Sequence, residues 1–206
     1  MANESRADHV RHSIFLEYLT IGWNSVECLV AVVSGLLAGS VALIGFGVDS
    51  AIESMSGSVL LWRLYAERSG KHIGTLERRA LKLVGVSFLL LAAYVAVDSA
   101  YTLISRKQPE RSVVGIGLAV VSMIAMPLLA GAKRKAAGRL HSAALRADSR
   151  QTSLCAYLSA ILLGGLLLNA SLSWWWADPL AALAMVPIIV NEGVEALKGE
   201  SCRDCH

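Results

Sequence analysis

Long apolar stretches alternate with short polar segments along the whole chain. They lie at residues 14–37, 41–65, 81–104, 113–132, 152–172 and 175–196. A helix needs about 20 apolar residues to cross the hydrocarbon core of a bilayer, and each stretch is about that long. The pattern therefore predicts an all-α membrane protein with six transmembrane helices.

Together with the short segments between them, these stretches occupy nearly all of the 206 residues. We expect a cytoplasmic N-terminal segment at 1–13, one transmembrane domain at 14–196 and a short Cys/His tail at 197–206. The composition agrees, because only 17% of the residues are charged and 55% are hydrophobic, whereas about 25% are charged in soluble proteins.

The positions of the positive charges predict the orientation. Of the 19 Lys and Arg residues, only Arg106, Lys107 and Arg111 fall in loops on the side of the membrane opposite the two termini. Cytoplasmic loops retain Lys and Arg, so both termini should be cytoplasmic in an inner or plasma membrane. Since the basic residues lie in short loops between apolar stretches, we do not expect nucleic-acid binding. No nucleophile motif, phosphate-binding glycine loop or membrane histidine cluster indicates an enzyme.

A short sequence recurs in the two halves of the chain. Ser40-Val41-Ala42-Leu43 opens the second span, and Ser142-Ala143-Ala144-Leu145 precedes the fifth. Each half has three spans, an odd number, so the halves would insert with opposite orientations. The pattern predicts a 3+3 inverted repeat, as in many secondary transporters.

The second span carries two acidic residues on one helix face, Asp49 and Glu53. They lie about 13 and 20 Å from Ser40 along the helix, close to the bilayer midplane. Two carboxylates at that depth need a proton, a basic partner or a bound cation. No Lys or Arg falls in the middle of any predicted span, so we expect protons and a metal ion to alternate there. The alternative is a protonated or hydrogen-bonded pair that fixes helix packing.

Gln151 and Cys155 stand at the same offsets from Ser142 as Asp49 and Glu53 from Ser40. The combined set offers two carboxylates, an amide oxygen and a thiolate. This mixture suits zinc, or cobalt, cadmium or nickel, better than magnesium or calcium. The alternatives are a buried core thiol for Cys155 and an interhelical hydrogen bond for Gln151.

Other polar residues inside the predicted spans are Glu27 and Asn24 in the first span and Asp98 in the third. They are candidates for additional metal contacts or a proton path, or for interhelical hydrogen bonds. We include Glu27 among the candidate metal ligands.

Four further acids are expected to be structural or solvated. Asp178, before Pro179, predicts the N-cap of the sixth helix. Asp148 is expected in the cytoplasmic mouth, and Glu17 and Glu192 near the cytoplasmic interface, where they reach water.

The chain ends with Cys202, Cys205 and His206. Two thiols and an imidazole are suitable ligands for a soft metal. A metal-collecting tail and a passive tail both remain open.

These motifs together resemble the cation diffusion facilitators over about residues 14–196. The entry Ser40-Val41-Ala42-Leu43 followed by Asp49-x-x-x-Glu53 is similar to their second helix. The step Ala147-Asp148-Ser149 is similar to the entry of their fifth helix, and Asp178-Pro179-Leu180-Ala181-Ala182 to the opening of their sixth. Gln151 and Cys155 fall where the family usually has His and Asp.

The resemblance implies a metal site between the second and fifth helices and metal export driven by a proton gradient. It also implies that a cytoplasmic C-terminal domain typical of the family is missing, so a homodimer would use the membrane helices. The expected activity is transport of a divalent transition metal. The alternative is a membrane metal-binding or regulatory subunit that does not transport.

Overall fold

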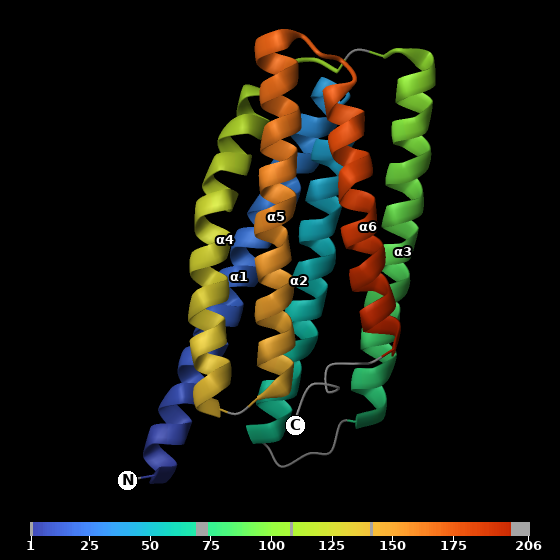
Figure 1. Ribbon diagram of the computed structural model, residues 1–206. Coiled ribbons are helices and arrows are strands. Elements are labelled where there is room, and N and C mark those ends of the chain that lie inside the picture. Colours follow the sequence, from blue (N-terminus) through green and yellow to red (C-terminus); the bar gives the residue numbers. More distant parts are fainter. Residues whose placement is uncertain (1, 69–73, 108, 141, 199–206) are drawn as a thin grey trace.

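Six long helices make up nearly all of the chain described by the computed structural model, which covers residues 2–68, 74–107, 109–140 and 142–198. They are α1 (Ala2–Ala38), α2 (Val41–Arg68), α3 (Gly74–Ser105), α4 (Val113–Leu140), α5 (Ala143–Leu172) and α6 (Ala177–Lys198). The helices run up and down alternately in one bundle (Figure 1). We call the end where α1 begins and α6 ends the lower end, and the end where α1 joins α2 the upper end.

The surface and composition of the helices identify a multi-pass integral membrane protein. Five of the six helices are long and apolar enough to cross a membrane. The exception is α2, whose apolar character is lowered by Asp49, Glu53 and several serines. Large apolar side chains such as Leu29, Leu90 and Ile104 point outward and are exposed, as expected for helices that face lipid.

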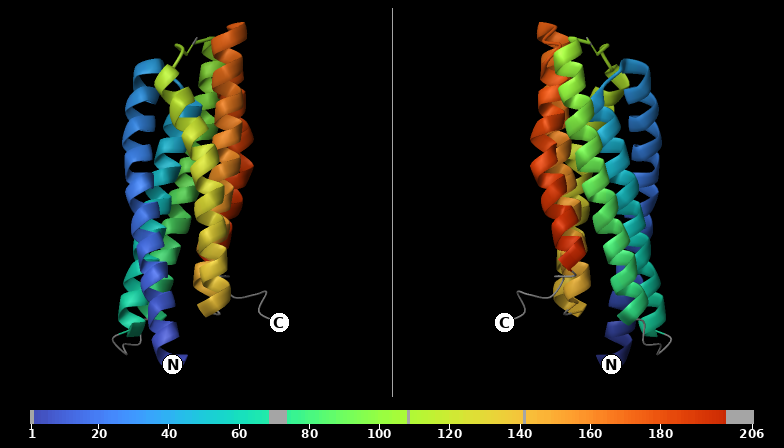
Figure 2. Two further views of the ribbon diagram at one scale, coloured as in Figure 1. Left: turned by 90° about the vertical axis from the view of Figure 1, so that its left-hand side faces the viewer. Right: turned by 90° about the vertical axis from the view of Figure 1, so that its right-hand side faces the viewer.

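The most extensive helix contacts join α1 with α2, α4 with α5 and α3 with α6. Helix α2 also contacts α3, α5 and α6, and α5 contacts α6, so α2 and α5 lie in the middle of the bundle (Figure 1). Figure 2 shows the same bundle from its two sides. Two glycines allow α3 and α6 to approach closely. A Cβ atom at Gly85 would lie 2.8 Å from the carbonyl oxygen of Gly193, and small residues are common at such membrane helix crossings.

The two recurring sequences begin α2 and α5 in the same way. The Ser40 hydroxyl accepts a hydrogen bond from the backbone N–H of Leu43, and the Ser142 hydroxyl accepts one from Leu145. Both serines therefore satisfy an N–H group of the first helical turn. The inverted repeat itself stays a prediction.

The fourth and fifth helices are both longer than their apolar spans. The basic stretch from Lys133 to Arg150 predicts an extension of the fifth helix into water, and α5 begins at Ala143. The same stretch also lengthens α4, which continues beyond the expected 113–132 to Leu140. Polar residues at the ends of a membrane helix keep helical hydrogen bonding in water, so apolar length underestimates the helix.

The N-cap prediction for Asp178 is wrong. Asp178 lies inside the first turn of α6, and its carboxylate accepts hydrogen bonds from the Ser40 hydroxyl and from the backbone N–H of Ala42. It thus stabilises the start of α2, because its negative charge lies at the positive end of that helix dipole.

Two apolar clusters fill the bundle above and below a polar layer. The larger cluster lies in the upper part and includes Phe46, Leu158, Leu162 and Met185. The lower cluster consists of Ile14, Leu60, Leu64, Ala137 and Leu145. The polar layer between them contains the residues described next.

Candidate functional site

Asp49 and Glu53 on α2 meet Cys155 on α5 inside the bundle. The Cys155 thiol donates to Glu53 Oε2 at 2.8 Å and lies 3.7 Å from Asp49 Oδ2. The three side chains are at most 5% exposed. This contact was predicted from the matched offsets of the two helices.

Gln151 lies one turn away from that contact. Its Oε1 accepts a hydrogen bond from the Ser56 hydroxyl at 3.1 Å, and no hydrogen bond joins it to Asp49 or Glu53. The reason is that α2 runs down while α5 runs up, so equal offsets do not give equal depth. Cys155 therefore faces the acidic pair, and Gln151 faces the next turn of α2.

The arrangement leaves polar atoms without partners. Glu53 Oε1 and Gln151 Nε2 are buried and make no hydrogen bond, which is unfavourable unless another group binds them. Within the part of the chain that the structure describes, no group of three or more His, Cys, Asp and Glu side chains is arranged to hold a metal ion. The predicted ligands therefore form a contact of two carboxylates and a thiol, with the amide beside it.

Glu27 on α1 is fully buried and binds two serines. Ser50 on α2 donates to Glu27 Oε2 at 2.8 Å, and Ser122 on α4 donates to Oε1. The carboxylate thus joins three helices, which matches the alternative of interhelical hydrogen bonding. Its role as a metal ligand stays a prediction.

A buried lysine lies in the polar layer, although none was expected inside the spans. Lys133 Nζ on α4 is 2.5 Å from Asp148 Oδ2 on α5 and 3.1 Å from Glu17 Oε2 on α1. Lys133 and Glu17 are fully buried and Asp148 is 7% exposed, so the expectation that Asp148 and Glu17 reach water is wrong. We call these three residues the lower ion triad.

The helical spacing of α4 indicates that Lys133 is buried, although the hydropathy pattern does not. Ser122, Met126, Lys133 and Ala137 recur at intervals of four or seven and are all buried. Extending that inner face beyond residue 132 would have placed Lys133 inside the bundle.

The remaining sequence candidates lie apart from the contact or outside the described residues. Asn24 is buried and its amide makes no hydrogen bond. Asp98 accepts a hydrogen bond from Tyr94 of its own helix at 3.3 Å. Glu192 on α6 is half-buried and close enough to interact electrostatically with Asp49. The tail with Cys202, Cys205 and His206 lies outside the described residues.

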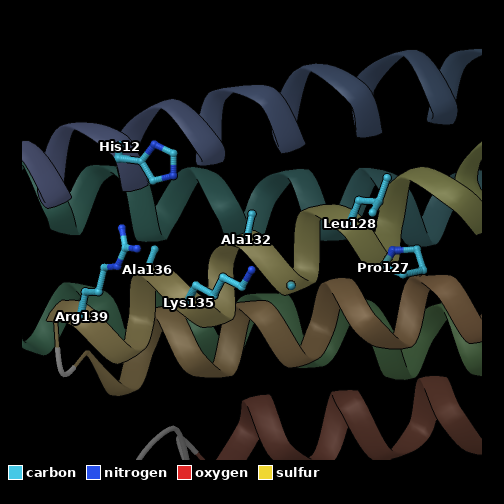
Figure 3. Close-up of a pocket in the computed structure, with 8 residues that line it drawn as sticks. His12, Pro127, Leu128, Ala132, Lys135, Ala136 and Arg139 are labelled. Carbon is cyan, nitrogen blue, oxygen red and sulfur yellow. The ribbon is translucent and has the colours of Figure 1, made fainter.

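A groove on the bundle surface is lined by residues of α1 and α4 (Figure 3). Basic side chains of His12, Lys135 and Arg139 line it toward the lower end, and Pro127 and Leu128 line its apolar part. Neither Asp49 nor Glu53 lines this groove.

A six-helix membrane bundle with a carboxylate pair and a thiol between α2 and α5 places the chain in the class of integral membrane cation transporters. The chain belongs to the cation efflux family, because residues 18–200 match the model of the cation efflux transmembrane domain. This confirms the family predicted from the sequence motifs.

Two curated relatives are similar to most of the chain. Transmembrane protein 163 of Xenopus laevis is 23% identical over 188 residues, which are 91% of this chain and 66% of that protein. An uncharacterized transporter of Synechocystis sp. is 26% identical over 169 residues, which are 79% of this chain and 54% of that protein. The chain thus spans about two thirds of the first relative's length and about half of the second's.

Proposed function

We propose that this chain transports a divalent transition-metal cation, zinc first among the candidates, in exchange for protons. Asp49, Glu53 and Cys155 bind the cation, and Gln151 and Glu27 are further candidate ligands. The observation that carries the proposal is the buried contact of the Cys155 thiol with both carboxylates across α2 and α5.

The donor set supports a transition metal as the cargo. Two carboxylates and a thiolate provide two negative oxygens and one soft sulfur, a combination that zinc, cadmium and cobalt accept. Magnesium and calcium prefer oxygen ligands only. Membership of the cation efflux family supports the same class of cargo.

The contact also supports proton exchange. In the structure the thiol donates a hydrogen bond to Glu53 and so carries its proton, whereas a metal ligand must be deprotonated. Metal binding therefore releases protons from this layer, and metal release allows protons to return. A site that holds one or the other, but not both, couples their movements.

The orientation follows from the basic residues. Exposed Arg11, Arg134, Lys135 and Arg139 gather toward the lower end, and cytoplasmic surfaces retain positive charge. The lower end then faces the cytoplasm, and export moves the cation from the lower to the upper end.

Metal flux in proteoliposomes tests the proposal. Asp49→Asn and Glu53→Gln should each abolish uptake of zinc driven by a pH gradient, because each removes one buried negative donor. The matched control is Asp98→Asn, an acid on α3 whose described contact is within its own helix, and its flux should equal that of the wild type. Wild-type flux in Asp49→Asn would refute the proposal.

One observation favours a second candidate function, a membrane subunit that binds metal without transporting it. Gln151 replaces the family's usual histidine and is hydrogen-bonded to Ser56 instead of the acidic pair. That function predicts saturable zinc binding by the purified protein and no flux under any pH gradient. Flux driven by a pH gradient excludes it.

A further inference from the structure

The lower ion triad has two carboxyl groups and only one ammonium group. Its single ammonium group, on Lys133, lies between the carboxylates of Glu17 and Asp148. Glu17 is fully buried, and its Oε1 atom has no hydrogen-bond partner. The lysine therefore satisfies one oxygen of Glu17 and leaves the other unsatisfied in a site that excludes water, which is an unfavourable arrangement for a carboxylate.

The triad lies between the lower end and the acidic contact. Asp148 is seven residues before Cys155 on α5, which corresponds to roughly 10 Å along the helix. Asp148, Thr152 and Cys155 share the buried face of α5. Lys133 Nζ also lies 3.5 Å from the Thr152 hydroxyl and is close enough to Glu53 to interact electrostatically.

The residues around the triad are small or apolar. Gly57 of α2 faces the Glu17 carboxylate, since a Cβ atom there would lie 3.5 Å from Glu17 Oε2. Below the triad, the lower apolar cluster of Ile14, Leu60, Leu64, Ala137 and Leu145 closes the bundle. A cation that entered from the lower end would meet these two carboxylates before it reached Asp49 and Glu53.

We propose that Glu17 and Asp148 form a second cation site on the lower half of the pathway. The ammonium group of Lys133 occupies this site when no cation is bound. The arriving divalent cation displaces the Lys133 ammonium, binds both carboxylates and the Thr152 hydroxyl, and then moves on to the acidic contact. This inference rests on the proposed transport function, which supplies the cation.

Charge and ligand type determine which cations would compete with the lysine. A divalent ion can bind both carboxyl groups at once, including the Glu17 Oε1 atom that the ammonium group leaves without a partner. The donors are oxygen atoms only, in contrast to the contact with Cys155. Oxygen donors favour a harder ion such as Mn²⁺ over the soft Cd²⁺, so Mn²⁺ is the appropriate probe for this site.

Chemical labelling of the purified full-length protein tests the displacement directly. A small amine-acylating reagent is applied with and without saturating Mn²⁺, and modification of individual lysines is measured by mass spectrometry. We expect labelling of Lys133 to rise at least fivefold with Mn²⁺, while labelling of Lys135, an exposed lysine two residues away, stays unchanged. Equal labelling of Lys133 in both conditions would overturn the proposal.

A binding measurement in the Asp49→Asn background tests the site independently of the central contact. The Lys133→Met/Asp49→Asn protein should bind Mn²⁺ at this site at least tenfold more tightly than Asp49→Asn, because no ammonium group competes, as measured by loss of the free Mn²⁺ resonance. Adding Asp148→Asn should abolish this gain in affinity. If the folded double variant binds Mn²⁺ no more tightly than Asp49→Asn, the proposal is overturned.

The two measurements separate this inference from the proposed function. If Asp49→Asn leaves zinc flux unchanged, the proposed central site fails, but the labelling and Mn²⁺ results are still readable. If the Lys133→Met variant does not fold, the labelling of Lys133 in the wild-type and Asp49→Asn proteins decides.

Discussion

The thiol of Cys155 on α5 lies 2.8 Å from the carboxylate of Glu53 on α2, and this contact joins the two central helices of the bundle. Cys155 stands where the cation diffusion facilitators that the sequence resembles usually have Asp on the fifth helix. A sulfur ligand at this point should influence which cation the protein prefers, because soft ligands favour soft metals.

Replacing Cys155 by Ser should change metal preference. Serine keeps a similar size and hydrogen bonding but removes the soft ligand, so we expect the affinity for Cd²⁺ to fall roughly tenfold to a hundredfold, the usual range for altered metal sites. Equilibrium dialysis with Cd²⁺ and Mn²⁺ on the same preparation measures the effect. Parallel losses for both ions would indicate that Cys155 acts through packing instead of ligation.

Replacing Lys133 by Ala should destabilise the fold strongly. Removal of the single cation leaves Glu17 and Asp148 buried with uncompensated charge, which typically destabilises by about 3–5 kcal/mol. Thermal unfolding in detergent measures the change, and Lys135→Ala, an exposed neighbour on α4, should stay within about 0.5 kcal/mol of the wild type. Saturating Mn²⁺ should recover part of the lost stability in Lys133→Ala. Equal stability of the two variants would contradict the importance of the buried ion pair.

Replacing Asp178 by Ala should loosen the start of α2. The Ser40 hydroxyl and the Ala42 N–H would lose their acceptor, and a buried donor left unsatisfied destabilises by about 1–3 kcal/mol. Hydrogen exchange of the amides at residues 41–44 should accelerate in this variant. The control Glu110→Ala removes an exposed acid at the same upper end and should leave that exchange unchanged.

Replacing Gly85 by Ala should separate α3 from α6. The new Cβ atom would lie 2.8 Å from the carbonyl oxygen of Gly193 and 2.9 Å from the backbone nitrogen of Leu197. Backbone atoms cannot move aside as a flexible side chain does, so we expect destabilisation of about 1–3 kcal/mol.

Gly117→Ala is the matched control, and we expect it to change the stability of the protein in the opposite direction. Gly117 lies inside α4, and a Cβ atom there would have no neighbour within 4 Å. Gly117→Ala should therefore stabilise the protein by about 0.5–1 kcal/mol, because glycine is unfavourable in a helix interior. Thermal unfolding of both variants measures the contrast, and destabilisation of similar size in both would contradict the close crossing of α3 and α6.

The sequence predicted the contact of α2 with α5 because two matched entry motifs set the register of Asp49, Glu53 and Cys155. Gln151 lies one turn from that contact and binds Ser56, so its role as a ligand stays a prediction. One-dimensional spacing fixes the face of a helix but not the depth at which two antiparallel helices meet.

The buried ion pair and the cap of α2 could not be predicted in the same way. Hydropathy assigns Lys133 to water because it counts a charge without its partners, and those partners come from α1 and α5. The sequence around Asp178 is typical of an N-cap for its own helix. Its carboxylate instead accepts a hydrogen bond from Ala42 at the start of α2, 136 positions away along the chain. Interactions between distant segments depend on the packed bundle, which local patterns do not contain.

Helix α2 contains Asp49 and Glu53 and, further along the same rod, Leu60 and Leu64 of the lower apolar cluster. A helix transmits displacement along its length, so a tilt that parts the leucines from Ile14 and Leu145 also shifts the carboxylates relative to Cys155. In the proposed function, opening of the lower end and a change in how the carboxylates bind the cation would then occur together.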